Sequence, residues 1–96
     1  MTITNKNDAN KAAVLERLKA VRTALQNEPQ SPSSARALEQ CDRLELAITQ
    51  FHAEGLRFAA FTLFRMVFAQ GTVFTKPVHG ATQELKTALD VAGYPH

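Results

Sequence analysis

The chain has 96 residues, which is enough for one domain of ordinary size. Apolar residues make up 45% of it, tryptophan is absent, tyrosine occurs once, and there are only four glycines and four prolines. This composition favours helices over a β-sandwich or a low-complexity disordered segment. The net charge of +2 is far below the clustered basic load that nucleic-acid binding usually requires, so we expect no nucleic-acid partner.

The supply of large apolar side chains is modest. Fifteen of the apolar residues are alanine, which contributes little buried area. The others suffice for a small core, and a domain of this size buries a smaller share of its surface than a larger one does. We therefore expect the fold to be stabilised by a partner.

The N-terminus and the single cysteine bear on the compartment. Residues 1–7 are polar and offer nothing to bury, so we expect a disordered N-terminus followed by a single α-helical domain over residues 8–96. The N-terminus lacks the apolar stretch of a signal peptide, and no run of about 18 uncharged apolar residues indicates a transmembrane segment. Cys41 has no disulfide partner and falls in a helical pattern, where a small buried side chain is the expected role. These features favour a cytoplasmic protein.

Two amphipathic helices are predicted in the first half of the chain. Residues 8–28 and 32–54 each carry an apolar stripe with steps of four and three residues. Pro29 ends the first helix, and Ser31 followed by Pro32 is typical of a helix start. Because the connection is short, the helices should form an antiparallel helical hairpin. The residues expected in its seam are Val14, Leu18, Val21, Leu25, Ala37, Cys41, Leu44, Ile48 and Phe51.

Charge favours the same pairing. Residues 1–25 hold five basic and two acidic side chains, whereas residues 36–54 hold four acidic and two basic ones. The two helices should therefore attract each other. Because exposed ion pairs contribute only about 0.2 to 1 kcal/mol each, we expect this charge to orient the hairpin more than to stabilise it.

Gly55 leaves two interpretations of the middle of the chain. As the left-handed residue of a helix C-terminus, it would place Leu56 against Phe51 and turn the chain sharply. As an interior glycine, it would cost about 1 kcal/mol relative to alanine while the helix continued. No loop and no Ser, Thr, Asp or Asn cap follows Gly55. We therefore favour one long helix, straight or kinked, from residue 32 to about residue 70, with the corner at Gly55 as the alternative.

Residues 56–70 form the Phe-rich helix. Their apolar side chains fall on more than half of the helix circumference, so they need cover on two sides. A strand is the alternative, because phenylalanine and Val67 also suit strands. Arg57 falls inside the apolar arc, between Phe64 and Phe68, where a guanidinium must stack, reach a carboxylate such as Glu54, or extend to water. The alternative to these structural roles is an interface arginine that binds an acidic group of a partner chain or ligand.

The C-terminal part is expected to hold one short helix. Residues 72–78 read as extended chain or loop, because Pro77 does not fit a central strand. A helix is predicted from about residue 81 to residue 92, and Gly93 should stop it, with Tyr94 placed to contact Leu89. The predicted fold is thus all-α: a helical hairpin, the Phe-rich helix, which may continue the second hairpin helix, and a short C-terminal helix in a small helical bundle.

Catalytic motifs are absent from the sequence. It contains no glycine-rich phosphate loop, no H-E-x-x-H motif, no paired cysteines and no G-x-S-x-G motif. His52 shares a polar line with Glu45, but a metal site would need a further ligand from another helix or subunit. We therefore expect no enzyme activity, no cofactor and no metal.

The strongest functional signal is a cationic, aromatic segment. Between Gly55 and Gln83 the chain has no acidic residue but carries five phenylalanines and three basic residues. We expect a small helical protein–protein interaction module, such as an adaptor, inhibitor or regulator, which self-associates as a homodimer or binds a protein target. The candidate partner-binding residues are Arg57, Phe61, Phe64, Arg65 and Phe68. The alternatives are a bundle that binds an apolar or anionic small molecule and interfacial membrane binding through residues 55–70.

Overall fold

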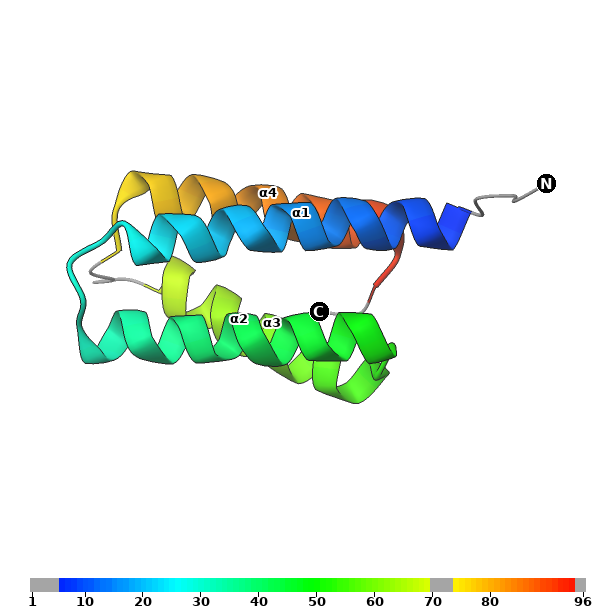
Figure 1. The fold of residues 1–96 in the computed structure, drawn as a ribbon, viewed down its shortest axis with the longest axis horizontal. Coiled ribbons are helices and arrows are strands. Elements are labelled where there is room, and N and C mark those ends of the chain that lie inside the picture. Colours follow the sequence, from blue (N-terminus) through cyan, green and yellow to red (C-terminus); the bar gives the residue numbers. More distant parts are fainter. Residues whose placement is uncertain (1–5, 70–73, 95–96) are drawn as a thin grey trace.

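The computed structural model describes residues 6–69 and 74–94. Over these residues the chain forms four helices and no strand: α1 (Lys6–Gln26), α2 (Pro32–Gln50), α3 (Ala53–Phe68) and α4 (Lys76–Ala92). Successive helices run in opposite directions and pack as a small bundle (Figure 1). The predicted all-α fold is confirmed. Residues 1–5, which include most of the predicted disordered N-terminus, lie outside the described residues.

The core of the hairpin follows the predicted stripe. Eight of the nine predicted seam residues are at most 1% exposed, from Val14 on α1 to Ile48 on α2. Phe51 is the exception, because its side chain is 64% exposed. Helix α1 starts two residues before the predicted start at residue 8 and ends two residues before the predicted end at residue 28. The hairpin is therefore confirmed, with Phe51 removed from its seam.

The polar contacts of the hairpin agree with the charge pattern. The Arg22 guanidinium on α1 donates to the Asp42 carboxylate at 2.9 Å and to the Glu45 carboxylate at 3.3 Å, both on α2. Helix α2 starts with the predicted Ser31 cap: the Ser31 hydroxyl accepts from the backbone N–H of Ser34, and the Ser34 hydroxyl accepts from the backbone N–H of Ser31. This reciprocal pair satisfies two backbone donors that a helix start otherwise leaves free.

The predicted continuous helix from residue 32 to residue 70 is wrong. Helix α2 ends at Gln50, and Phe51 adopts the left-handed conformation with φ 52° and ψ 54°. The N–H of Phe51 bonds to the carbonyl of Ile48, and the N–H of His52 bonds to the carbonyl of Ala47 at 2.8 Å. These two bonds are those of a Schellman helix end, which normally uses glycine at the left-handed position. The corner therefore lies four residues before Gly55.

Helix α3 starts with an unusual cap. His52 has an extended backbone, and its Nδ1 accepts a hydrogen bond from the N–H of Gly55 at 3.2 Å. Gly55 is thus neither the predicted helix stop nor an ordinary interior glycine, because it sits in the first turn of α3 as the donor to this cap. A Cβ at this position would come 3.1 Å from Nδ1 of His52, so a glycine leaves room for the ring.

Helix α4 is longer than predicted. It starts at Lys76 and places Pro77 in its first turn. A proline is tolerated there because a backbone N–H at this position would have no acceptor within the helix. The expectation of extended chain is therefore wrong for residues 76–78, and residues 72–73 lie outside the described residues. The backbone N–H of Thr75, just before α4, donates to the Glu28 carboxylate at 2.5 Å and so joins the end of α1 to the start of α4.

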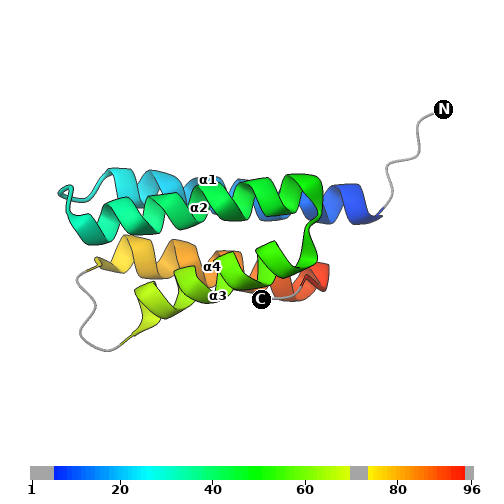
Figure 2. The same cartoon turned by 90° about the horizontal axis from the view of Figure 1, so that it is seen from below.

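The end of α4 is as predicted. Gly93 is left-handed with φ 73°, and the N–H of Tyr94 bonds to the carbonyl of Leu89 at 3.0 Å. Helix α4 packs most extensively on α1. Helix α3 packs mainly on α2 and only sparsely on α4, which it crosses obliquely at the edge of the bundle (Figure 2). One side of α3 is therefore left without a neighbouring helix.

Candidate functional site

Helix α3 divides into a buried and an exposed side. The buried side carries six residues that contact the rest of the bundle: Leu56, Ala59, Ala60, Leu63, Phe64 and Val67. On the opposite side, Phe58 and Phe61 are 64% and 56% exposed. The exposed side is called here the outer face of α3. Its residues are Glu54, Arg57, Phe58, Phe61, Arg65 and Phe68.

The candidate partner-binding residues are not all equivalent. Arg57, Phe61, Arg65 and Phe68 come together on the outer face, whereas Phe64 turns inward and is only 9% exposed. The Phe68 ring is 37% exposed and lies 6.1 Å from the Phe64 ring. It also lies 6.0 Å from the His79 ring of α4, so it covers the sparse contact between α3 and α4. Phe64 therefore supports the outer face from beneath.

The two arginines of the outer face keep their charge exposed. In the described part of the chain, ion pairs form at Arg17, Arg22 and Arg43, but not at Arg57 or Arg65. Arg57 is exposed, which agrees with the expected arrangement in which its guanidinium extends to water. The outer face thus combines apolar rings with two guanidinium groups that form no ion pair with a described residue.

Two hollows border this face. The first has a volume of about 420 Å³ and is lined by Glu54, Arg57, Phe58 and Phe61. The second, about 330 Å³, lies between α2 and α3 and shares Phe58 with the first. It is bordered by Leu46, a large apolar side chain that is 57% exposed. Phenylalanine rings therefore form part of concave surfaces as well as the convex side of the helix.

Sequence reasoning missed Phe58, Glu54 and Leu46 as members of this surface. The signal for Phe58 was present, because it lies on the side of the helix opposite Leu56 and one turn before Phe61. Leu46 could not be found in this way, since its place depends on how α2 and α3 meet at the Phe51 corner.

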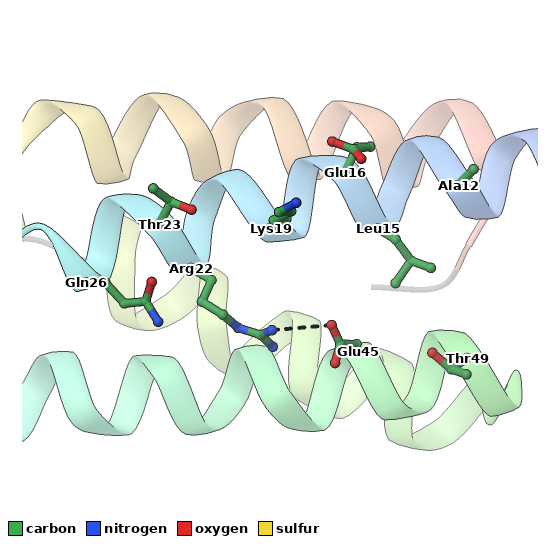
Figure 3. A pocket seen from close by; sticks show the side chains of 9 residues that line it. All are labelled: Ala12, Leu15, Glu16, Lys19, Arg22, Thr23, Gln26, Glu45 and Thr49. Atoms are coloured by element: carbon green, nitrogen blue, oxygen red, sulfur yellow. Dashed lines mark hydrogen bonds and ion pairs between the residues drawn. The ribbon is translucent and has the colours of Figure 1, made fainter.

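A larger hollow lies elsewhere, between α1 and α2, with a volume of about 650 Å³ (Figure 3). Arg22 and Glu45 face each other across it and are joined by their ion pair (Figure 3). The guanidinium of Arg22 is thus already paired within the hairpin, and the other lining side chains belong to the flanks of two packed helices. We assign it a structural role.

Nucleophilic and metal-binding groups are sparse in the described residues. Cys41 is fully buried, and burial raises the pKa of its thiol from 9.0 to about 12, which opposes formation of the reactive thiolate. Over the part of the chain that the structure describes, no group of three or more His, Cys, Asp or Glu residues is arranged to hold a metal ion. No described helix is both long enough and apolar enough to cross a membrane.

Compared with protein-family models, curated proteins and solved structures, the chain matches none of them.

Proposed function

We propose that the protein is a non-enzymatic helical interaction module that self-associates through the outer face of α3. The observation that supports this most strongly is the exposure of Phe58 and Phe61, because a phenylalanine ring in water loses the free energy that burial would give it. Monomeric soluble proteins rarely expose contiguous apolar patches larger than a few hundred Å², and larger patches mark interaction sites. The flanking Arg57 and Arg65 fit the arginine enrichment of such interfaces.

The expected interface is small. Each phenylalanine ring carries about 150 to 250 Å² of surface, so covering the exposed parts of two rings from each copy removes about 400 Å² of ring surface from water. Interfaces of stable complexes bury at least about 1,200 Å² in total. We therefore expect a concentration-dependent association with a Kd on the order of micromolar.

Sedimentation of the wild-type protein over a range of concentrations, beside Phe58→Ser and Phe61→Ser, tests this proposal. The wild type should shift from monomer towards dimer as its concentration rises, and each variant should remain a monomer. Val91→Ser is the matched control, because Val91 is 74% exposed on α4, away from the outer face, and its replacement should leave the association unchanged. A wild type that stays monomeric at high micromolar concentration, or binds anionic lipid vesicles through these rings, would contradict the proposal.

A further inference from the structure

The outer face of α3 carries a regular seam. Glu54, Phe58, Phe61 and Arg65 follow one another at steps of four, three and four residues, which correspond to the d, a, d and a positions of a heptad. All four side chains are exposed, and they point away from the buried side of α3. In a coiled coil, such a seam is the line along which a second helix packs. The face therefore has the spacing needed to receive a helix.

We infer that this helix is α3 of a second copy of the chain, packed antiparallel about a two-fold axis that passes between residues 59 and 60. The inference rests on the proposed function, since it specifies the partner and the register at the same face. In this register, Phe58 lies against Phe61 of the second copy, and Glu54 lies against Arg65 of the second copy. Two-fold symmetry repeats both contacts, so every residue of the seam meets a complementary one.

The charges select this orientation. Glu54 and Arg65 are eleven residues apart in the sequence, so they stand about 16 Å apart along the helix axis and cannot pair with each other within a protomer. Within the described residues, neither forms an ion pair elsewhere. Parallel packing would place Glu54 against Glu54 and Arg65 against Arg65. Antiparallel packing places opposite charges together at both ends of the seam.

The hollow on this face has the form that the register requires. Its lining residues Glu54, Arg57, Phe58 and Phe61 stand at positions i, i+3, i+4 and i+7, which is the four-residue hole that receives a knob in coiled-coil packing. The midpoint of this hole falls opposite Phe61 of the second copy. The hollow of about 420 Å³ is therefore the place where that ring inserts, with Arg57 at its rim.

Charge reversal tests the register. In Glu54→Arg, and separately in Arg65→Glu, each dimer would contain two like-charge contacts in place of two opposite ones, so we expect the dimer Kd to rise about tenfold or more. In the double variant Glu54→Arg/Arg65→Glu, both contacts are again between opposite charges, and the Kd should return to within about threefold of the wild type. Sedimentation at low salt measures the Kd, and circular dichroism checks that each variant folds.

Mixing provides a second readout. At the ends of the seam, Glu54→Arg carries only positive charge and Arg65→Glu carries only negative charge. Each alone should associate about tenfold more weakly than the wild type, and an equimolar mixture should form a heterodimer. Glu16→Arg is the matched control for net charge, because Glu16 is exposed on α1, away from the seam, and its reversal should leave the Kd unchanged.

The outcomes separate the register from the face. In one outcome, Phe61→Ser abolishes association while the charge reversals leave the Kd unchanged; in another, the double variant associates as weakly as the single variants. Either result overturns the antiparallel register but keeps the outer face of α3 as the site of association. If Phe61→Ser leaves the Kd unchanged, or if the wild type does not associate, both the association through the outer face and its register are overturned. Rescue in the double variant together with heterodimer formation supports the register.

Discussion

Phe51 and Tyr94 meet edge to face at the end of the bundle, with ring centroids 5.6 Å apart and ring planes at 83°. Phe51 occupies the left-handed position that ends α2, and Tyr94 follows the left-handed Gly93 that ends α4. Two helix ends of the same hydrogen-bonded type are thus joined by an aromatic contact. One end uses glycine, and the other places a bulky side chain in a conformation that costs about 1 to 2 kcal/mol outside glycine.

This contact gives a prediction about position 51. Phe51→Ala removes the ring but keeps the strained backbone, and loss of an edge-to-face pair should lower the free energy of unfolding by about 0.5 to 1.5 kcal/mol. Phe51→Gly also removes the ring but relieves the backbone, so it should be more stable than Phe51→Ala by about 1 kcal/mol. Urea unfolding of both variants measures the difference. An alanine variant at least as stable as the glycine variant would show that position 51 is not left-handed in solution.

The imidazole cap of α3 gives a second prediction. His52→Ala removes the acceptor for the N–H of Gly55 and should lower the free energy of unfolding by about 1 kcal/mol. His52→Asn is the matched control, because asparagine is a good N-cap and should retain most of that stability. Thermal unfolding followed by circular dichroism checks both. Equal losses in the two variants would mean that His52 stabilises the corner by a contact other than its cap.

The seam of the hairpin could be predicted from the sequence, whereas the corner between α2 and α3 could not. Val14, Leu18 and the other seam residues repeat at steps of four and three, because each helix of a packed pair needs apolar residues at this spacing. The pattern can therefore be read within each helix alone. The corner depends on Phe51, a residue type that is uncommon at positive φ. Its cost is offset by two helix-end hydrogen bonds and by Tyr94, which is far away in the sequence.

The candidate site could likewise be predicted only in part from the sequence. Its location on the Phe-rich helix follows from composition, since no acidic residue lies between Gly55 and Gln83. Which rings face outward depends on the direction from which α2 and α4 cover the helix. This direction buries Phe64, exposes Phe58, and leaves Arg57 on the part of the apolar arc that faces solvent.

Burial of Cys41 predicts a specific pH dependence. Its pKa is about 12 in the folded protein, above the ordinary value of 9.0, so the folded state holds the proton more tightly than the unfolded state does. Below about pH 9 both states carry the neutral thiol, and stability is unaffected. As the pH rises towards 12, only the unfolded chain ionises, and each pH unit removes up to about 1.4 kcal/mol of the stability that Cys41 contributes.

Comparison with Cys41→Ala isolates this effect, because the other titrating groups are common to both proteins. The free energy of unfolding of the wild type, relative to Cys41→Ala, should fall by about 1.4 kcal/mol between pH 8 and pH 10. Urea unfolding at the two values measures it. A constant difference between the proteins would show that the thiol reaches solvent in the folded state.

Truncation of two phenylalanines on α3 should change the free energy of unfolding by very different amounts. Phe64 is 9% exposed and fills the core, so Phe64→Ala should lower the free energy of unfolding by about 3 to 5 kcal/mol. Phe61 is 56% exposed, so Phe61→Ala should change it by less than about 0.5 kcal/mol when unfolding is measured at a concentration where the protein is monomeric. Urea unfolding at low micromolar concentration, followed by circular dichroism, checks both values. A large loss for Phe61→Ala under these conditions would place this ring in the core of the protomer and remove it from the outer face.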